Sequence, residues 1–401
     1  MKKGNVLQKL LKQMESKNLI PFYTFEICSW LPYNHHMRFK IQKLLIFLII
    51  TRLLILILPW LLITLLFPEN HPQTFLDFTM AAWNRWDAPH YLYIAQHWYT
   101  NIGDEANFIV FFPLYPSIVK ALSFIADPVI SGIIISSTFF ILGSYYFYEL
   151  IKIDYSEKIA RWAVIAMAIF PTSYFFNAPY TESLFLFIFA TSLYAARKNN
   201  WIIAGLATAL GCITRPFGIL LLPAILVEWW VSKDRDWRQV PIIILPSTVT
   251  ILFYLYLNKI IYGNIFEFRN ILADHWQKHF MSPIASIMDT WRIAFSGGLN
   301  SFVIMVGWAE AITITLSWIL IPFAFKYLRK SWAVYYTLSI ILFSSTSFIL
   351  STPRYLLSIP PIFVLIAIAE KNTFFRLTWR FVSIALLFCF AILFARGQWA
   401  F

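Results

Sequence analysis

The feature that most limits the fold is a series of apolar runs that fills most of the chain after residue 43. A membrane-spanning helix needs roughly 20 apolar residues, and shorter ones are accepted inside a bundle. The runs lie at about 44–67, 129–151, 159–176, 182–196, 201–214, 217–231, 239–262, 302–325, 332–350, 355–369 and 377–395. Because 59% of residues are hydrophobic and only 13% are charged, polar side chains are too few to cover a soluble globule. The sequence therefore predicts an all-α, polytopic membrane protein.

Short basic clusters between these runs determine the predicted topology, because such clusters favour the cytoplasmic side. They are Arg197/Lys198, Lys233/Arg235/Arg238, Lys326/Arg329/Lys330 and Lys371/Arg376/Arg380. All four join a cytoplasmic N-terminus only if residues 108–126, a further apolar run interrupted by Pro113 and Pro116, do not cross. This assignment predicts about 11 transmembrane helices. The N-terminus is then cytoplasmic and the C-terminus external.

The same assignment sets the predicted domains. Residues 1–43 form a basic cytoplasmic segment with no cleavable signal pattern, and around Val6–Met14 this segment is either an interfacial helix or a disordered tail. Residues 44–401 form one transmembrane domain, whose two long external loops, 68–128 and 263–301, could roof a cavity.

Charge and cysteine content exclude several classes of function. The net charge of +12 does not indicate nucleic acid binding, because the basic residues do not follow one face; they indicate topology and contacts with the lipid bilayer. Cys28, Cys212 and Cys389 are far apart, so neither a disulfide framework nor a metal site is indicated. The sequence identifies no cofactor with certainty, and although a divalent metal ion could be bound, nothing in the sequence indicates one.

The first external loop carries the most unusual chemistry. Asn84-Arg-Trp-Asp-Ala-Pro-His-Tyr91 is followed by Phe111-Phe-Pro-Leu-Tyr-Pro116. Asp87 precedes a predicted short helix with Pro89 in its first turn, so its carboxylate either caps this helix or acts as a general base, or does both.

A membrane enzyme that works outside the cell has no access to ATP, so we expect its donor to be a lipid-phosphate-linked sugar. Asp87 could accept the proton of the incoming hydroxyl while a cation stabilises the departing phosphate. Arg215 and Arg354 each adjoin a proline at an external helix end, where they either bind this phosphate or snorkel to lipid headgroups.

Further candidates lie on the same predicted face. Glu182, in the segment Asn177-Ala-Pro-Tyr-Thr-Glu-Ser183, either complements a helix dipole, with Asn177 or Thr181 as the cap, or binds a sugar hydroxyl or a metal. His90 either faces the same cleft or packs among aromatic residues. Trp276 and Gln277 either contact a sugar or, for the tryptophan, anchor the membrane interface. Arg85, Trp86 and Tyr180 complete the candidate substrate-binding set, and Glu310, within an apolar run, is a weaker candidate.

These motifs resemble the PIG-V family of mannosyltransferases. The resemblance lies in Arg85-Trp-Asp-Ala-x-His-Tyr with Ile94-Ala95, in Phe111–Pro116, in Asn177-Ala-Pro-Tyr-Thr-Glu-Ser-Leu-Phe, in Thr214-Arg-Pro-x-Gly218 and in the weaker Pro353-Arg-Tyr-Leu. It covers roughly residues 44–370 and implies a GT-C-type fold whose first external loop contains short juxtamembrane helices. It also implies that Asp87 is the catalytic carboxylate and that Arg85, Trp86, His90, Glu182 and Arg215 surround it. Phe217 departs from the small polar residue expected before Gly218.

Two main hypotheses of function follow. The first is an inverting membrane glycosyltransferase, a mannosyltransferase, that transfers a sugar from a polyprenyl-phosphate-linked donor to a glycolipid, glycan or protein acceptor on the external face. The alternative is a transporter or flippase of a lipid-linked sugar, which would bind the same molecule in the same charged pocket. A noncatalytic assembly subunit is a third interpretation.

Overall fold

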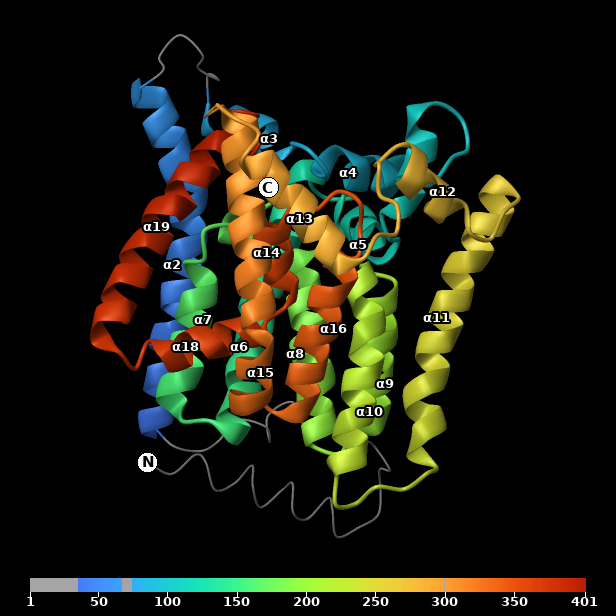
Figure 1. The fold of residues 1–401 in the computed structure, drawn as a ribbon, viewed down its shortest axis with the longest axis vertical. Coiled ribbons are helices and arrows are strands. Elements are labelled where there is room, and N and C mark those ends of the chain that lie inside the picture. The colour runs from blue at the N-terminus through green and yellow to red at the C-terminus, as the bar shows by residue number, and fades with distance from the viewer. Residues whose placement is uncertain (1–34, 67–73, 299) are drawn as a thin grey trace, which may run out of the picture. The chain divides into compact units, whose positions relative to one another are not determined.

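The computed structural model describes residues 35–66, 74–298 and 300–401 (Figure 1). Within these ranges the regular elements are helices, apart from an isolated bridge between Phe280 and Thr346. The prediction of an all-α protein is therefore confirmed. The chain divides into two units, Met1–Leu44 and Leu45–Phe401, and the description below concerns the second. The predicted interfacial helix at Val6–Met14 lies outside the described residues.

The order of elements follows the order of the apolar runs, with many short helices added. The elements are α2 His35–Leu66, α3 Phe75–Trp83, α4 Ala88–His97, η2 Asp104–Val110, α5 Leu114–Leu122, α6 Pro128–Asp154, α7 Glu157–Ala168, η3 Ser173–Phe176, α8 Glu182–Arg197, α9 Trp201–Cys212, η4 Pro216–Leu220, α10 Leu221–Val231, α11 Gln239–Tyr262, α12 Glu267–Asp274, α13 Pro283–Ala294, η5 Val303–Ala309, α14 Glu310–Ile319, α15 Ile321–Tyr327, α16 Lys330–Ser344, α17 Thr352–Tyr355, η6 Leu356–Ser358, α18 Pro361–Ala369 and α19 Thr373–Ala395.

Fewer helices than predicted are long enough to cross a membrane. Within the described ranges, four single helices qualify by length and composition: Ile41–Leu66, Pro128–Asp154, Gln239–Tyr262 and Thr373–Ala395. Two bent pairs raise the number to 6 if each pair is one span. The expected count of about 11 is thus not reproduced, because several runs break into short helices, as at α7 and α17. The chain is a multi-pass membrane protein whose inner helices are short and packed against protein.

The run at 108–126 divides into η2 and α5, and neither is a candidate span. With α3 and α4, these elements make the first long loop a set of short helices, as the sequence predicted for residues 68–128. The second long loop begins beside it, because Tyr262, the last residue of α11, donates its hydroxyl to the Thr100 carbonyl at 2.9 Å. Figure 1 shows α4, α5 and α12 at one end of the helices.

Two of the predicted cytoplasmic clusters meet at the other end of α8. Arg197, the last residue of α8, pairs with Asp154 at the end of α6. Arg329, just before α16, pairs with Glu228 at 2.6 Å. Since α8 has 16 residues and a helix rises ~1.5 Å per residue, these ion pairs lie about 24 Å from the first residue of α8.

Helix α9 and η4 meet so closely that only glycine fits at the contact. A Cβ added at Gly218 would lie 1.9 Å from the Gly211 carbonyl oxygen. Gly218→Ala should therefore lower stability by about 1–3 kcal/mol or more, the usual cost of overpacking, measured as a lower thermal midpoint in detergent. Gly211→Ala is the control, because its Cβ would first meet the flexible Leu221 side chain at 3.1 Å. Equal midpoints for the two variants would contradict this packing argument.

Candidate functional site

Asp87 stands at the N-cap position of α4, but its side chain accepts no capping hydrogen bond. Instead Oδ2 accepts a hydrogen bond of 2.6 Å from Nη1 of Arg354. The preceding Trp86 has a positive φ of 56°, an uncommon conformation outside glycine that turns the chain sharply before the helix. The Asp87 side chain keeps 25% of its surface exposed. Its carboxylate is thus bound to an arginine and is still accessible, which the capping role alone would not require.

Arg354 comes from α17, a helix of four residues that begins the segment Thr352–Ser358, which is bent by 99° against Pro361–Ala369. Its Nε donates to Oε1 of Glu182 at 2.7 Å, while its Nη1 reaches Asp87. The guanidinium also lies 4.5 Å from the ring centroid of Tyr180 and 4.9 Å from that of Phe175. With two carboxylates and two aromatic rings around it, this arginine is held inside the protein and does not snorkel to lipid.

Glu182 is the first residue of α8 and is completely buried. Besides Arg354, it has Nη1 of Arg215 at 3.1 Å from Oε1, an ion pair without hydrogen-bond geometry. Within the described chain, Nε and Nη1 of Arg215 and Oε2 of Glu182 are buried and make no hydrogen bond. Buried polar atoms are nearly always paired in folded proteins. Arg215 therefore has unused donors at the end of the cluster.

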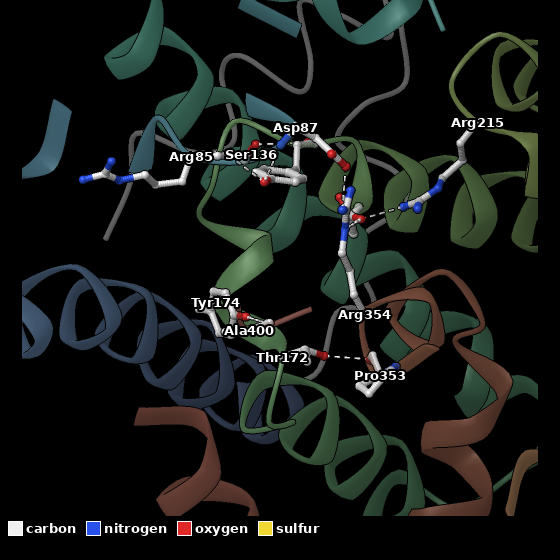
Figure 2. Close-up of polar contacts among 11 residues, drawn as sticks. Arg85, Asp87, Ser136, Thr172, Tyr174, Arg215, Pro353, Arg354 and Ala400 are labelled. Carbon is white, nitrogen blue, oxygen red and sulfur yellow. Dashed lines mark hydrogen bonds and ion pairs between the residues drawn. The ribbon is translucent and has the colours of Figure 1, made fainter. Parts of the chain in front are cut away.

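Ion pairs join the four charges into a line, Asp87–Arg354–Glu182–Arg215. Figure 2 labels Asp87, Arg354 and Arg215 in this line. Two carboxylates and two guanidinium groups leave no net charge. Asp87 stands at one end and Arg215 at the other, so the partly exposed carboxylate and the guanidinium with fewer hydrogen bonds are separated by an internally paired centre. The structure thus brings together the four charged residues that the sequence singled out in four separate motifs.

Tyr180 holds the backbone that carries Asp87. Its buried hydroxyl donates to the Arg85 carbonyl at 2.8 Å and accepts from the Asp87 N–H at 3.1 Å. Its own carbonyl accepts from Ser136 on α6, which in turn bonds Tyr115 of the Phe111–Pro116 motif. Tyr180, predicted as a substrate contact, therefore holds the Arg85–Asp87 backbone in place through its hydroxyl.

Several predicted residues contact other parts of the protein. Figure 2 shows the Arg85 guanidinium pointing away from the Asp87 carboxylate, although its backbone carbonyl belongs to the site. Trp86 packs edge-on against Trp399, with centroids 5.1 Å apart. The Gln277 side chain donates to the carbonyl of Asp274 in its own loop. None of these three side chains contacts the line of charges in the structure as described.

His90 lies in an aromatic cage. Its ring stacks on Phe111 with centroids 4.7 Å apart and meets Phe108 and Trp276 edge-on. Burial lowers the pKa of His90 below its ordinary value, although Asp87 opposes the shift, so the imidazole is neutral at neutral pH. Nδ1 of His90 and Nε1 of Trp276 are buried without a hydrogen bond in the described structure. Trp276 thus joins the site by packing, beside polar atoms that a ligand could engage.

Glu310 is fully buried and contacts the backbone just before Arg354. Its oxygens accept hydrogen bonds from the backbone N–H groups of Ser351 and Thr352. The weak prediction of a substrate role has no support from these contacts, since both partners are backbone.

Sequence reasoning missed Arg52, which lies inside an apolar helix. Its guanidinium donates to the carbonyls of Ala168 and Ser173 and to the side chain of Asn177. Asn177 therefore anchors Arg52 and does not cap α8, and Thr181 makes no side-chain cap either. A single arginine in a span was the available signal, because such a charge needs internal partners.

Phe217, the departure from the family pattern, is buried beside Tyr355 and Phe343, with Arg215 5.5 Å from its ring centroid. Its ring covers one side of the Arg215 guanidinium. Among residues 35–66, 74–298 and 300–401, no group of three or more His, Cys, Asp or Glu side chains could hold a metal ion.

Comparison with known proteins places the chain near the membrane mannosyltransferases. Residues 113–261, which include Tyr180, Glu182 and Arg215, match the family model described as dolichyl-phosphate-mannose-protein mannosyltransferase. A rat protein, GPI alpha-1,6-mannosyltransferase 2, is 24% identical over 165 residues. That match covers 38% of this chain, which spans about a third (33%) of the relative's length. The resemblance to the PIG-V mannosyltransferases is thereby confirmed.

A solved structure is also similar: the ArnT protein from Cupriavidus metallidurans, determined with bound undecaprenyl phosphate. The TM-score is 0.47 and the identity 15%, over 81% of this chain and 60% of the other.

Proposed function

We propose that this protein is an inverting membrane glycosyltransferase that transfers mannose from a polyprenyl-phosphate-linked donor to a glycolipid, glycan or protein acceptor. The observation that carries the proposal is the line of charges from Asp87 to Arg215, which presents a proton acceptor and a cation with unused donors at its two ends. The similarity to mannosyltransferases supports the choice of sugar.

The proposed reaction uses both ends of the line. The Asp87 carboxylate accepts the proton of the acceptor hydroxyl, and the hydroxyl oxygen attacks the anomeric carbon of the donor sugar. The bond from that carbon to the phosphate oxygen breaks on the opposite face, and its electrons leave with the polyprenyl phosphate. Arg215 stabilises this phosphate as its charge increases. Arg354 binds Oδ2 of Asp87, and no donor among the described residues contacts Oδ1, which is the oxygen we assign to proton transfer.

We also propose that the site faces the outside of the cell. Glu182 and Arg197 are the first and last residues of α8, and Arg197 belongs to the basic end of the molecule. Since basic clusters favour the cytoplasm, the opposite end of α8 is assigned to the external face. The donor would then reach Arg215 from the outer leaflet.

The test of function is a transfer assay with purified protein in detergent. Polyprenyl-phosphate mannose labelled in the sugar should yield a labelled product and free polyprenyl phosphate with a suitable member of an acceptor panel. GDP-mannose should support no transfer, because no soluble α/β domain is present to bind it in the described chain. Turnover of GDP-mannose would refute the donor assignment. Movement of the intact donor across vesicles without bond formation would instead support a flippase.

Thiol labelling tests the orientation. In a variant without Cys28, Cys212 and Cys389, a cysteine at Asn270 should react with an impermeant reagent in intact cells, whereas one at Asp234 should not. Asn270 lies in α12 and Asp234 in the connection between α10 and α11, and both residues are exposed, so accessibility alone does not separate them. Labelling of 234 but not of 270 would place the site on the cytoplasmic side.

A further inference from the structure

Glu310 is a buried carboxylate whose hydrogen-bond partners are backbone N–H groups and not a charged side chain. Oε1 accepts from the Ser351 N–H at 2.6 Å and Oε2 from the Thr352 N–H at 2.8 Å. A buried charge is costly unless it is well hydrogen-bonded, and charge-assisted hydrogen bonds are stronger than neutral ones. Both oxygens of this side chain are therefore committed to one short stretch of backbone.

That stretch places Arg354. Ser351 has a φ of 69°, a left-handed conformation that is uncommon for serine and persists only where the surroundings enforce it. Thr352, next along the chain, starts α17, and Arg354 follows two residues later. In the same turn, the Thr172 hydroxyl donates to the Pro353 carbonyl at 2.8 Å (Figure 2). The turn is thus held by two side chains, and the carboxylate makes the stronger hydrogen bonds.

The position of Glu310 itself is set by an irregular helix. The π-helix η5 ends immediately before Glu310, and such wide turns are rare and are frequently found at functional sites. Gly307 in this segment packs so closely on α13 that an added Cβ would lie 2.7 Å from Cα of Ala294. The tight contact fixes η5 against α13 and so fixes where α14 begins.

We propose that Glu310 is a positioning residue, whose carboxylate clamps the Ser351–Thr352 backbone so that Arg354 bridges Asp87 and Glu182. This proposal rests on the transferase function. Glu310 makes no contact with the line of charges in the described structure, so it acts through Arg354. The competing interpretation is a buried carboxylate that stabilises the fold and has no separate effect on the reaction.

Two matched substitutions separate these interpretations. Glu310→Gln keeps one acceptor oxygen but sets an amide NH₂ against the second backbone N–H. The transfer rate per folded molecule should fall about 10- to 100-fold, the effect of a displacement near 1 Å in an active site. Glu370→Gln is the control, because Glu370 is equally buried but pairs with Arg380 at 2.6 Å, away from Arg354. It should lower the thermal midpoint and leave the rate per folded molecule unchanged.

A double-mutant cycle with Arg354→Lys tests the route of the effect. If Glu310 acts through Arg354, Glu310→Gln adds little to the loss caused by Arg354→Lys; if it acts independently, the two losses multiply. Ser351→Gly should restore part of the rate of Glu310→Gln, because glycine adopts positive φ without strain. Multiplied losses, or a parental rate in Glu310→Gln, would overturn the clamp.

A binding measurement that needs no turnover tests the clamp separately from the transferase function. Polyprenyl phosphate should raise the thermal midpoint of the parent and of Glu370→Gln, and raise it less in Glu310→Gln and Arg354→Lys, with no further reduction in the double variant. If the parent makes no product with any donor, the transferase function fails, and this binding cycle still decides the clamp. Should Glu310→Gln not fold, Glu310→Asp replaces it in both cycles, with the same expected dependence on Arg354.

Discussion

Asp87→Asn should lower the rate of mannose transfer by a factor of about 10² to 10⁴, the usual weight of general base catalysis. Asparagine keeps the shape of the side chain and an oxygen that can accept from Arg354, but it cannot take the proton of the acceptor hydroxyl. A loss of activity through unfolding of α4 is not expected, because the Asp87 side chain makes no capping hydrogen bond to this helix. Initial rates with labelled polyprenyl-phosphate mannose, normalised to folded protein, measure the effect.

The fold should survive this substitution. Arg354 keeps its 2.7 Å bond to the buried Glu182, and Tyr180 still binds the Asp87 N–H. We expect a loss of about 1 kcal/mol, as for one hydrogen bond weakened by the loss of charge. Asp127→Asn is the matched control, since Asp127 does cap α6 through the Val129 N–H at 2.8 Å and asparagine caps as well as aspartate. If Asp87→Asn retains more than about a tenth of the parental rate, the loss is smaller than expected for a general base. That result would contradict the catalytic assignment of Asp87.

The fold class was predictable because membrane-spanning helices require long apolar runs and because basic clusters favour the cytoplasmic side. The sequence predicted too many spans because hydropathy does not distinguish lipid from the interior of a helical bundle. The run at 159–176 illustrates this: α7 ends at Ala168, and the residues after it form a turn that binds Arg52. Such a run is apolar because other parts of the protein surround it. The point at which its helix ends can be identified only once the residues that contact it are known.

The charged residues of the site were predictable for a different reason. Asp87, Glu182, Arg215 and Arg354 each stand in a mainly apolar chain where an unpaired charge is costly, so partners were expected. Their pairing was not predictable, because Asp87 and Arg354 are 267 positions apart. The turn around Ser351 could not be foreseen either, since the Glu310 contacts are with backbone N–H groups, which every residue except proline provides.

Arg215→Met should reduce kcat/KM for the lipid-linked donor by about 10² to 10³, comparable to the loss of one preorganised donor to a developing anion. The donor is a phosphodiester with one negative charge, whereas the departing phosphate monoester carries nearly two. Arg215, whose Nε and Nη1 make no hydrogen bond in the described chain, would therefore bind the transition state more strongly than the ground state. Stability should change less than activity, because Glu182 remains paired with Arg354.

Two comparisons make the Arg215 assignment specific. Arg292→Met removes an arginine whose side chain is 72% exposed in its pair with Asp289, and this change should leave the rate unaffected. Arg215→Lys keeps the charge but loses the planar fork, so we expect intermediate activity. Because the phosphate gains charge as it leaves, inhibition by the product polyprenyl phosphate should weaken in Arg215→Met in parallel with kcat/KM. Unchanged product inhibition together with a reduced rate would show that the phosphate binds elsewhere, and Lys278, 5.6 Å from the ring centroid of Tyr355 beside Arg215, would then be the cation to test.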